Sequence, residues 1–132
     1  YLAGTWASSR AGAEATRFGR KRVLLVSIAT LIVGVTITLS DNVFVVLAGL
    51  VIGTAGFFGA HAIASGWTGR EATVGKAQAA SLYTLFFYGG SSVVGWFGGV
   101  AFDAAGWTAV AMTIVVLAGG AAVMALVLLR RD

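Results

Sequence analysis

Four long apolar runs occupy most of this chain and leave only short polar stretches between them. They cover approximately Val23 to Leu39, Val43 to Ser65, Ala79 to Phe102 and Trp107 to Leu129. A helix rises 1.5 Å per residue, so about 20 apolar residues cross the roughly 30 Å of hydrocarbon in a bilayer. A transmembrane strand needs only about ten residues of alternating polarity, a pattern that these runs lack. The runs therefore predict an all-α membrane protein with four transmembrane helices, preceded by the end of a further helix.

The composition supports a membrane environment independently. Hydrophobic residues make up 58% of the chain and charged residues 11%, and the mean hydropathy is +0.92. This leaves too little polar surface to cover a soluble domain. A net charge of +4 would favour nucleic-acid binding in a soluble protein. Here the basic residues flank apolar runs, so the lipid bilayer is the expected partner and nucleic acid is not.

The side chains of this sequence do not favour a metal site or an enzyme active site. The chain has no cysteine and a single histidine. Disulfides and thiolate metal sites are therefore excluded, and one imidazole does not assemble a metal centre. No nucleophile stands beside a general base. We expect no metal, no cofactor and no enzymatic activity.

The basic residues are distributed unevenly between the polar stretches. All nine Lys and Arg residues lie in Arg10 to Arg22, Arg70 to Lys76 and Arg130 to Arg131. The two short stretches around Asp41 and Asp103 carry no basic residue and would each join antiparallel neighbouring helices. Because positive charge marks the cytoplasmic side, residues 10–22, residues 66–77 and the C-terminus are predicted to be cytoplasmic. The expected location is the plasma membrane, which is the inner membrane in a bacterium.

The first basic stretch contains a spaced motif. It consists of Gly12, Thr16, Arg17, Gly19, Arg20 and Lys21. The spacing resembles the cytoplasmic loop signature of the major facilitator superfamily, in which an acidic residue usually stands where this chain has Thr16. The same glycine spacing recurs without basic residues at Gly99, Asp103 and Gly106, as inverted three-helix repeats predict.

The basic residues of this motif allow two interpretations. Cations at helix ends can bind terminal carbonyl groups or a nearby carboxylate in one conformation and release them in another, which would form a latch. Alternatively, Arg17, Arg20 and Lys21 only anchor the loop to headgroups and set the topology. The two interpretations are compatible.

The resemblance implies that residues 1–132 are the C-terminal part of a twelve-helix secondary transporter. Residues 1–15 would be the end of helix 8, and residues 16–22 the cytoplasmic loop after it. Helices 9 to 12 would then lie at residues 23–39, 43–65, 79–102 and 107–129. The N-terminal six-helix half of the same chain would be the partner, and the two halves would rock about a central site for a small-molecule substrate.

Two segments narrow the resemblance to drug and sugar efflux members of this superfamily. They are His61 to Trp67 and Tyr88 to Ser92. The resemblance implies efflux of a drug- or sugar-like solute in exchange for protons, as in an antiporter. The competing hypothesis is a non-transporting four-helix membrane scaffold or subunit.

The two middle runs hold the candidate cavity residues. These are Phe58, His61, Phe87, Tyr88, Ser91 and Ser92. Aromatic rings beside hydroxyl groups suit an amphipathic or aromatic solute, whereas a tight helix crossing with hydrogen-bonded serines is the alternative. His61 is the only readily ionisable residue within the four runs, but it lies about 27 Å from Val43, near the cytoplasmic end. It therefore either caps local backbone or carries protons.

Small residues at helical spacing predict close helix packing. In the second run they are Gly49, Gly53 and Gly56, and in the third run Gly95 and Gly99. Such stripes let a neighbouring helix approach closely.

Overall fold

Four helices make up the described part of the chain, residues 2–129 of a computed structural model. They are α1 (Leu2–Phe18), α2 (Arg20–Ile37), α3 (Val43–Glu71) and α4 (Lys76–Leu128). The all-α prediction is confirmed, because no strand occurs within this range. α3 and α4 are long and apolar enough to cross a membrane.

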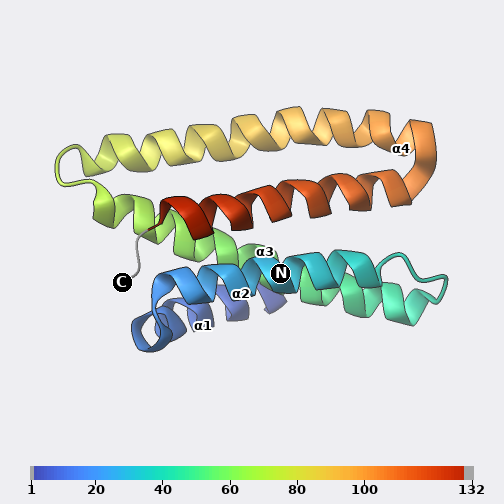
Figure 1. Cartoon of the computed structure of the whole chain (residues 1–132), viewed down its shortest axis with the longest axis horizontal. Helices are drawn as coiled ribbons and strands as arrows, with labels where there is room; N and C mark the ends of the chain where they lie inside the picture. The colour runs from blue at the N-terminus through green and yellow to red at the C-terminus, as the bar shows by residue number, and fades with distance from the viewer. Residues whose placement is uncertain (1, 130–132) are drawn as a thin grey trace.

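Helix α4 is folded back on itself. The backbone leaves the helical region at Ala105 (φ −149°, ψ 23°) and Gly106 (φ 68°, ψ −159°). Glycine accommodates the positive φ because it has no Cβ. Residues 76–104, the first arm, and residues 107–128, the second arm, therefore run in opposite directions (Figure 1).

The two basic connections are shorter than we expected from the polar stretches. Only Gly19, with φ 85°, separates α1 from α2, so the expected loop at residues 16–22 is wrong in extent. Likewise α3 continues to Glu71, and only residues 72–75 separate it from α4. Charged residues such as Arg and Lys are good helix formers, so these helices continue beyond their apolar segments. Gly19 ends α1 at positive φ, whereas α3 ends at Ala72 and Gly75 at positive φ begins α4.

The turn between α2 and α3 is short and capped. The Asn42 side chain accepts a hydrogen bond from the Phe44 backbone N–H at 2.9 Å, which begins α3. Thr38 ends α2 and is almost completely buried. Its hydroxyl donates to the Val35 carbonyl and accepts a 2.9 Å hydrogen bond from the Trp107 indole, which ties the second arm of α4 to this end of α2.

Helices α2 and α3 approach each other through glycines. A Cβ added to Gly34 would overlap the backbone of Gly53, and a Cβ added to Gly56 would overlap the backbone of Leu31. One added to Gly49 would lie 2.8 Å from the Gly34 carbonyl oxygen. The two helices therefore pack backbone against backbone, which only residues without side chains permit.

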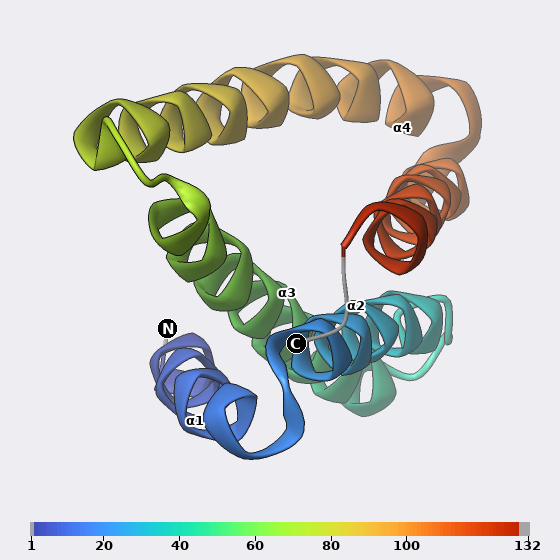
Figure 2. The same ribbon diagram turned by 60° about the vertical axis from the view of Figure 1, so that its left-hand side comes forward.

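The core lies where α2, α3 and the second arm of α4 meet. It contains Val23, Leu24, Ile28, Ile63, Trp67, Ala118 and Ala125, with Ala11 from α1. The first arm has no buried residue, and Phe86 and Trp96 on it are 76% and 66% exposed. Figure 2 shows this arm far from α1 and α2. Its side chains thus remain available to lipid or to another part of a larger protein.

Candidate functional site

One hydrogen bond joins α3 to the first arm of α4. The Tyr83 hydroxyl lies 2.9 Å from Nδ1 of His61 and 3.4 Å from the His61 carbonyl oxygen. When the imidazole carries its proton on Nε2, the phenol O–H donates to Nδ1. The histidine is therefore tied to another helix by a side-chain partner, beyond the local capping that the sequence suggested.

Aromatic rings surround this hydrogen bond. The Phe87 ring centroid lies 4.5 Å from that of His61, and the Phe57 ring centroid lies 6.2 Å from both. Tyr83 stacks with Phe87 at 6.5 Å. We call Phe57, His61, Tyr83 and Phe87 the aromatic cluster. It offers ring faces and one imidazole, groups that contact an aromatic or amphipathic molecule favourably.

The Phe58 ring lies 5.3 Å from that of Phe57 in an edge-on arrangement, but it packs on the side of α3 that faces α1. Its ring packs against α1, where a Cβ on Gly4 would lie 2.6 Å from the ring. The Phe58 carbonyl accepts a 3.4 Å hydrogen bond from the hydroxyl of Ser8, which also belongs to α1. Successive residues of a helix point about 100° apart, so Phe57 and Phe58 face different neighbours.

The remaining cavity candidates lie on the exposed first arm. Tyr88 is 65% exposed, with its ring 5.3 Å from that of Phe87. The hydroxyls of Ser91 and Ser92 donate to the carbonyls of Phe87 and Tyr88 in the preceding turn, at 2.7 and 2.9 Å. These are bonds within one helix, so the described structure contains no serine-bonded helix crossing here. α4 also continues as a regular helix through residues 89 and 90.

The basic motif contacts two different elements. The Lys21 ammonium donates to the carbonyls of Leu126 and Leu129, each at 2.8 Å, at the C-terminal end of α4. Unpaired carbonyls at a helix C-terminus attract cations. Arg17 places its guanidinium carbon 5.5 Å from the Phe18 ring centroid. Gly12 is helical and has open space beside it.

The predicted packing glycines divide into two groups. Gly49, Gly53 and Gly56 are buried against α2. Gly95 and Gly99 have no atom within 4 Å of an added Cβ, so they do not mediate packing within residues 2–129. The physical reason is that no described helix lies against that face of the first arm.

Phe57 and Tyr83 were not predicted as partners of His61. Both were visible as aromatic residues four positions from His61 and Phe87 respectively, on the same helix faces. The spacing within each helix does not show that this face of α3 contacts this face of the first arm of α4.

Taken together, apolar helices folded into antiparallel pairs and packed through glycines define a polytopic helical membrane protein. The profile of the Major Facilitator Superfamily matches residues 1–132. The chain belongs to this superfamily, as its basic motif indicated.

Similar proteins have transporter names. The chain is 37% identical over 117 residues to an uncharacterized transporter of Buchnera aphidicola subsp. Schizaphis graminum, covering 89% of this chain and 28% of the relative. It is 39% identical over 109 residues to the uncharacterized MFS-type transporter YybF of Bacillus subtilis, covering 83% and 27%. It is 40% identical over 117 residues to the inner membrane transport protein YnfM of Escherichia coli, covering 89% and 28%.

The chain therefore spans little more than a quarter of the length of these relatives. No solved structure matches it significantly.

Proposed function

We propose that the chain is the C-terminal part of a secondary active transporter of twelve helices in a bacterial inner membrane. In this proposal α1 is the end of helix 8, α2 is helix 9, α3 is helix 10, and the two arms of α4 are helices 11 and 12. The exposed first arm supports it, because the N-terminal half of the parent protein would cover that surface. The basic connections would face the cytoplasm.

The aromatic cluster carries the transport proposal. It joins α3 to the one arm that is not packed into the core, with His61 hydrogen-bonded to Tyr83 across the two helices. Such a hydrogen bond can break and form again when one helix moves relative to the other, as alternating access requires. The Phe87 ring and the exposed Tyr88 ring would form part of the wall that contacts a small organic solute.

The proposed reaction is export of a drug- or sugar-like solute in exchange for protons. Lys21 would act as a cytoplasmic latch, because its two hydrogen bonds hold the motif against the end of α4. Breaking them exposes the helix-end carbonyls to water, so the latch can open at the membrane surface without stranding buried groups.

Flux measurements test this proposal. The full-length protein that contains this chain is reconstituted in liposomes, and uptake of labelled drugs and sugars is measured with and without an imposed proton gradient. We expect saturable, gradient-dependent flux that falls at least fivefold in His61→Gln, with Arg70→Gln as the control. If the flux of every solute is non-saturable and independent of the proton gradient, the transporter hypothesis is overturned and the hypothesis of a non-transporting scaffold is favoured.

A further inference from the structure

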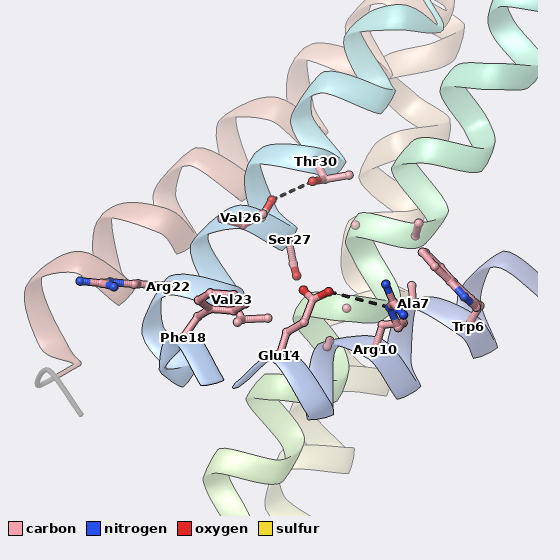
Figure 3. A pocket seen from close by; sticks show the side chains of 14 residues that line it. Trp6, Ala7, Arg10, Glu14, Phe18, Arg22, Val23, Val26, Ser27 and Thr30 are labelled. Carbon is pink, nitrogen blue, oxygen red and sulfur yellow. Dashed lines mark hydrogen bonds and ion pairs between the residues drawn. The ribbon is translucent and has the colours of Figure 1, made fainter. Parts of the chain in front are cut away.

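A groove of about 270 Å³ lies between α1 and α2. The surface of α3 around Gly56 and Gly59 forms its floor. Figure 3 shows Arg10 between Glu14 and Trp6, with Ser27 directed toward Glu14 from the opposite helix. The groove thus combines a guanidinium, a carboxylate, an indole and a hydroxyl group.

These groups lie on the apolar side of the basic residues of α2, and the Arg10 and Glu14 side chains are 62% and 49% exposed. A Cβ on Gly59 would contact both Ser27 and Ala11, at 2.8 and 3.9 Å, so these three residues share one level. Ser27 follows Arg22, the last basic residue of this stretch, by five positions. At 1.5 Å per residue, that level is about 7.5 Å inside the basic boundary of α2. Arg10 is adjacent to Ala11 and therefore lies near the same level, on the membrane side of the boundary predicted for the cytoplasmic residues 10–22.

The Arg10 guanidinium is incompletely satisfied within residues 2–129. Its Nε lies 3.9 Å from Oε1 of Glu14, which is longer than a hydrogen bond. Its central carbon lies 5.3 Å from the Trp6 ring centroid. The Ser27 hydroxyl has no hydrogen-bond partner among the residues described. The exposed guanidinium has five N–H donors, which leaves room for a second carboxylate.

We propose that this groove binds an amphipathic organic acid. The carboxylate of the ligand pairs with Arg10 and accepts a hydrogen bond from Ser27, and its aromatic body stacks on Trp6. Glu14 competes with the ligand for Arg10, so binding releases Glu14 from the ion pair. Arg22, at the basic boundary, also lines the groove, but the Trp6 indole beside Arg10 favours an aromatic acid over a lipid phosphate.

This inference goes beyond the proposed function, because the groove lies between α1 and α2 and not at the aromatic cluster. Equilibrium dialysis tests it without measuring flux. The probe is 2-naphthoate, with uncharged 2-naphthamide for comparison, on the full-length protein in nanodiscs of zwitterionic lipid. We expect saturable 2-naphthoate binding that is at least tenfold tighter than that of 2-naphthamide.

Matched variants assign the binding to the groove. Arg10→Gln should weaken 2-naphthoate binding at least tenfold, and Arg10→Lys less, because lysine keeps the charge but not the bidentate geometry. Glu14→Gln should strengthen it severalfold by removing the competing carboxylate. Arg70→Gln removes an arginine far from the groove and should leave binding unchanged.

Four outcomes overturn the inference. The first three are equal binding of 2-naphthoate and 2-naphthamide, unchanged binding in Arg10→Gln, and weaker binding in Glu14→Gln, which would indicate a cation site. Competitive loss of 2-naphthoate binding when anionic lipid replaces zwitterionic lipid would assign the groove to a lipid headgroup and also overturn it. If Arg10→Gln does not fold, binding to Glu14→Gln and the comparison of 2-naphthoate with 2-naphthamide decide whether the groove binds the organic acid. Binding without flux would leave this site standing and contradict only the transporter.

Discussion

The Tyr83 hydroxyl lies 2.9 Å from Nδ1 of His61 and joins α3 to the first arm of α4. The two residues belong to helices connected only at residues 72–75, where α3 ends and α4 begins. Phe87 and Phe57 pack around the bond. Because the first arm has no buried residue, this cluster is an important side-chain contact between it and α3.

Removing the Tyr83 hydroxyl should therefore loosen the first arm. We expect Tyr83→Phe to lower the unfolding free energy of the full-length protein by about 0.6–1.5 kcal/mol, as for other hydrogen bonds between membrane helices. The measurement is unfolding by SDS titration in mixed micelles. Tyr88→Phe is the matched control, because no hydrogen bond of the Tyr88 hydroxyl occurs among the described residues. An equal loss in both variants would contradict a specific role of the Tyr83 hydroxyl.

The close approach of α2 and α3 should make Gly56 intolerant of a side chain. A Cβ there overlaps the Leu31 backbone, so Gly56→Ala should destabilise the protein by about 1–3 kcal/mol through forced separation of the helices. Gly66→Ala on the same helix meets no atom within 4 Å and should be neutral or slightly stabilising, since alanine favours helix. SDS unfolding of both variants checks this, and equal stability of the two would show that the helices are not in backbone contact.

The Lys21 contacts should protect the end of α4. Lys21→Met removes both hydrogen bonds to the Leu126 and Leu129 carbonyls. Fraying of the last turn should then increase, with amide hydrogen exchange there at least fivefold faster. Arg17→Met is the control, because Arg17 packs on Phe18 instead. Unchanged exchange in Lys21→Met would mean that the helix end is held by other contacts.

Trp107 and Thr38 should be coupled energetically. The indole N–H donates to the nearly buried threonine hydroxyl at 2.9 Å. We expect a double-mutant cycle of Trp107→Phe and Thr38→Val to give a coupling energy of about 0.5–1.5 kcal/mol, because each single change removes the same hydrogen bond. Additive effects within error would show that the two groups do not interact in the membrane.

Much of the fold follows from one-dimensional patterns. The apolar runs predict the helices because a bilayer demands both the length and internal hydrogen bonding, and glycines at positive φ lie in the turns at positions 19, 75 and 106. The Gly49, Gly53 and Gly56 stripe is visible from helical spacing alone. Boundaries in the basic stretches were less accurate, since polar helix turns look like loops.

The sequence by itself determined the membrane environment, the helices and the superfamily. Local composition, periodicity and a spaced motif encode these properties. Only the tertiary structure decided which helix faces meet: that His61 contacts Tyr83 while Phe58 turns to α1, that Lys21 reaches the end of α4, and that Arg10 and Glu14 share a groove with Ser27. Contacts between distant residues depend on helix rotation and crossing, and a helix with apolar residues on all sides carries no periodic signal for either.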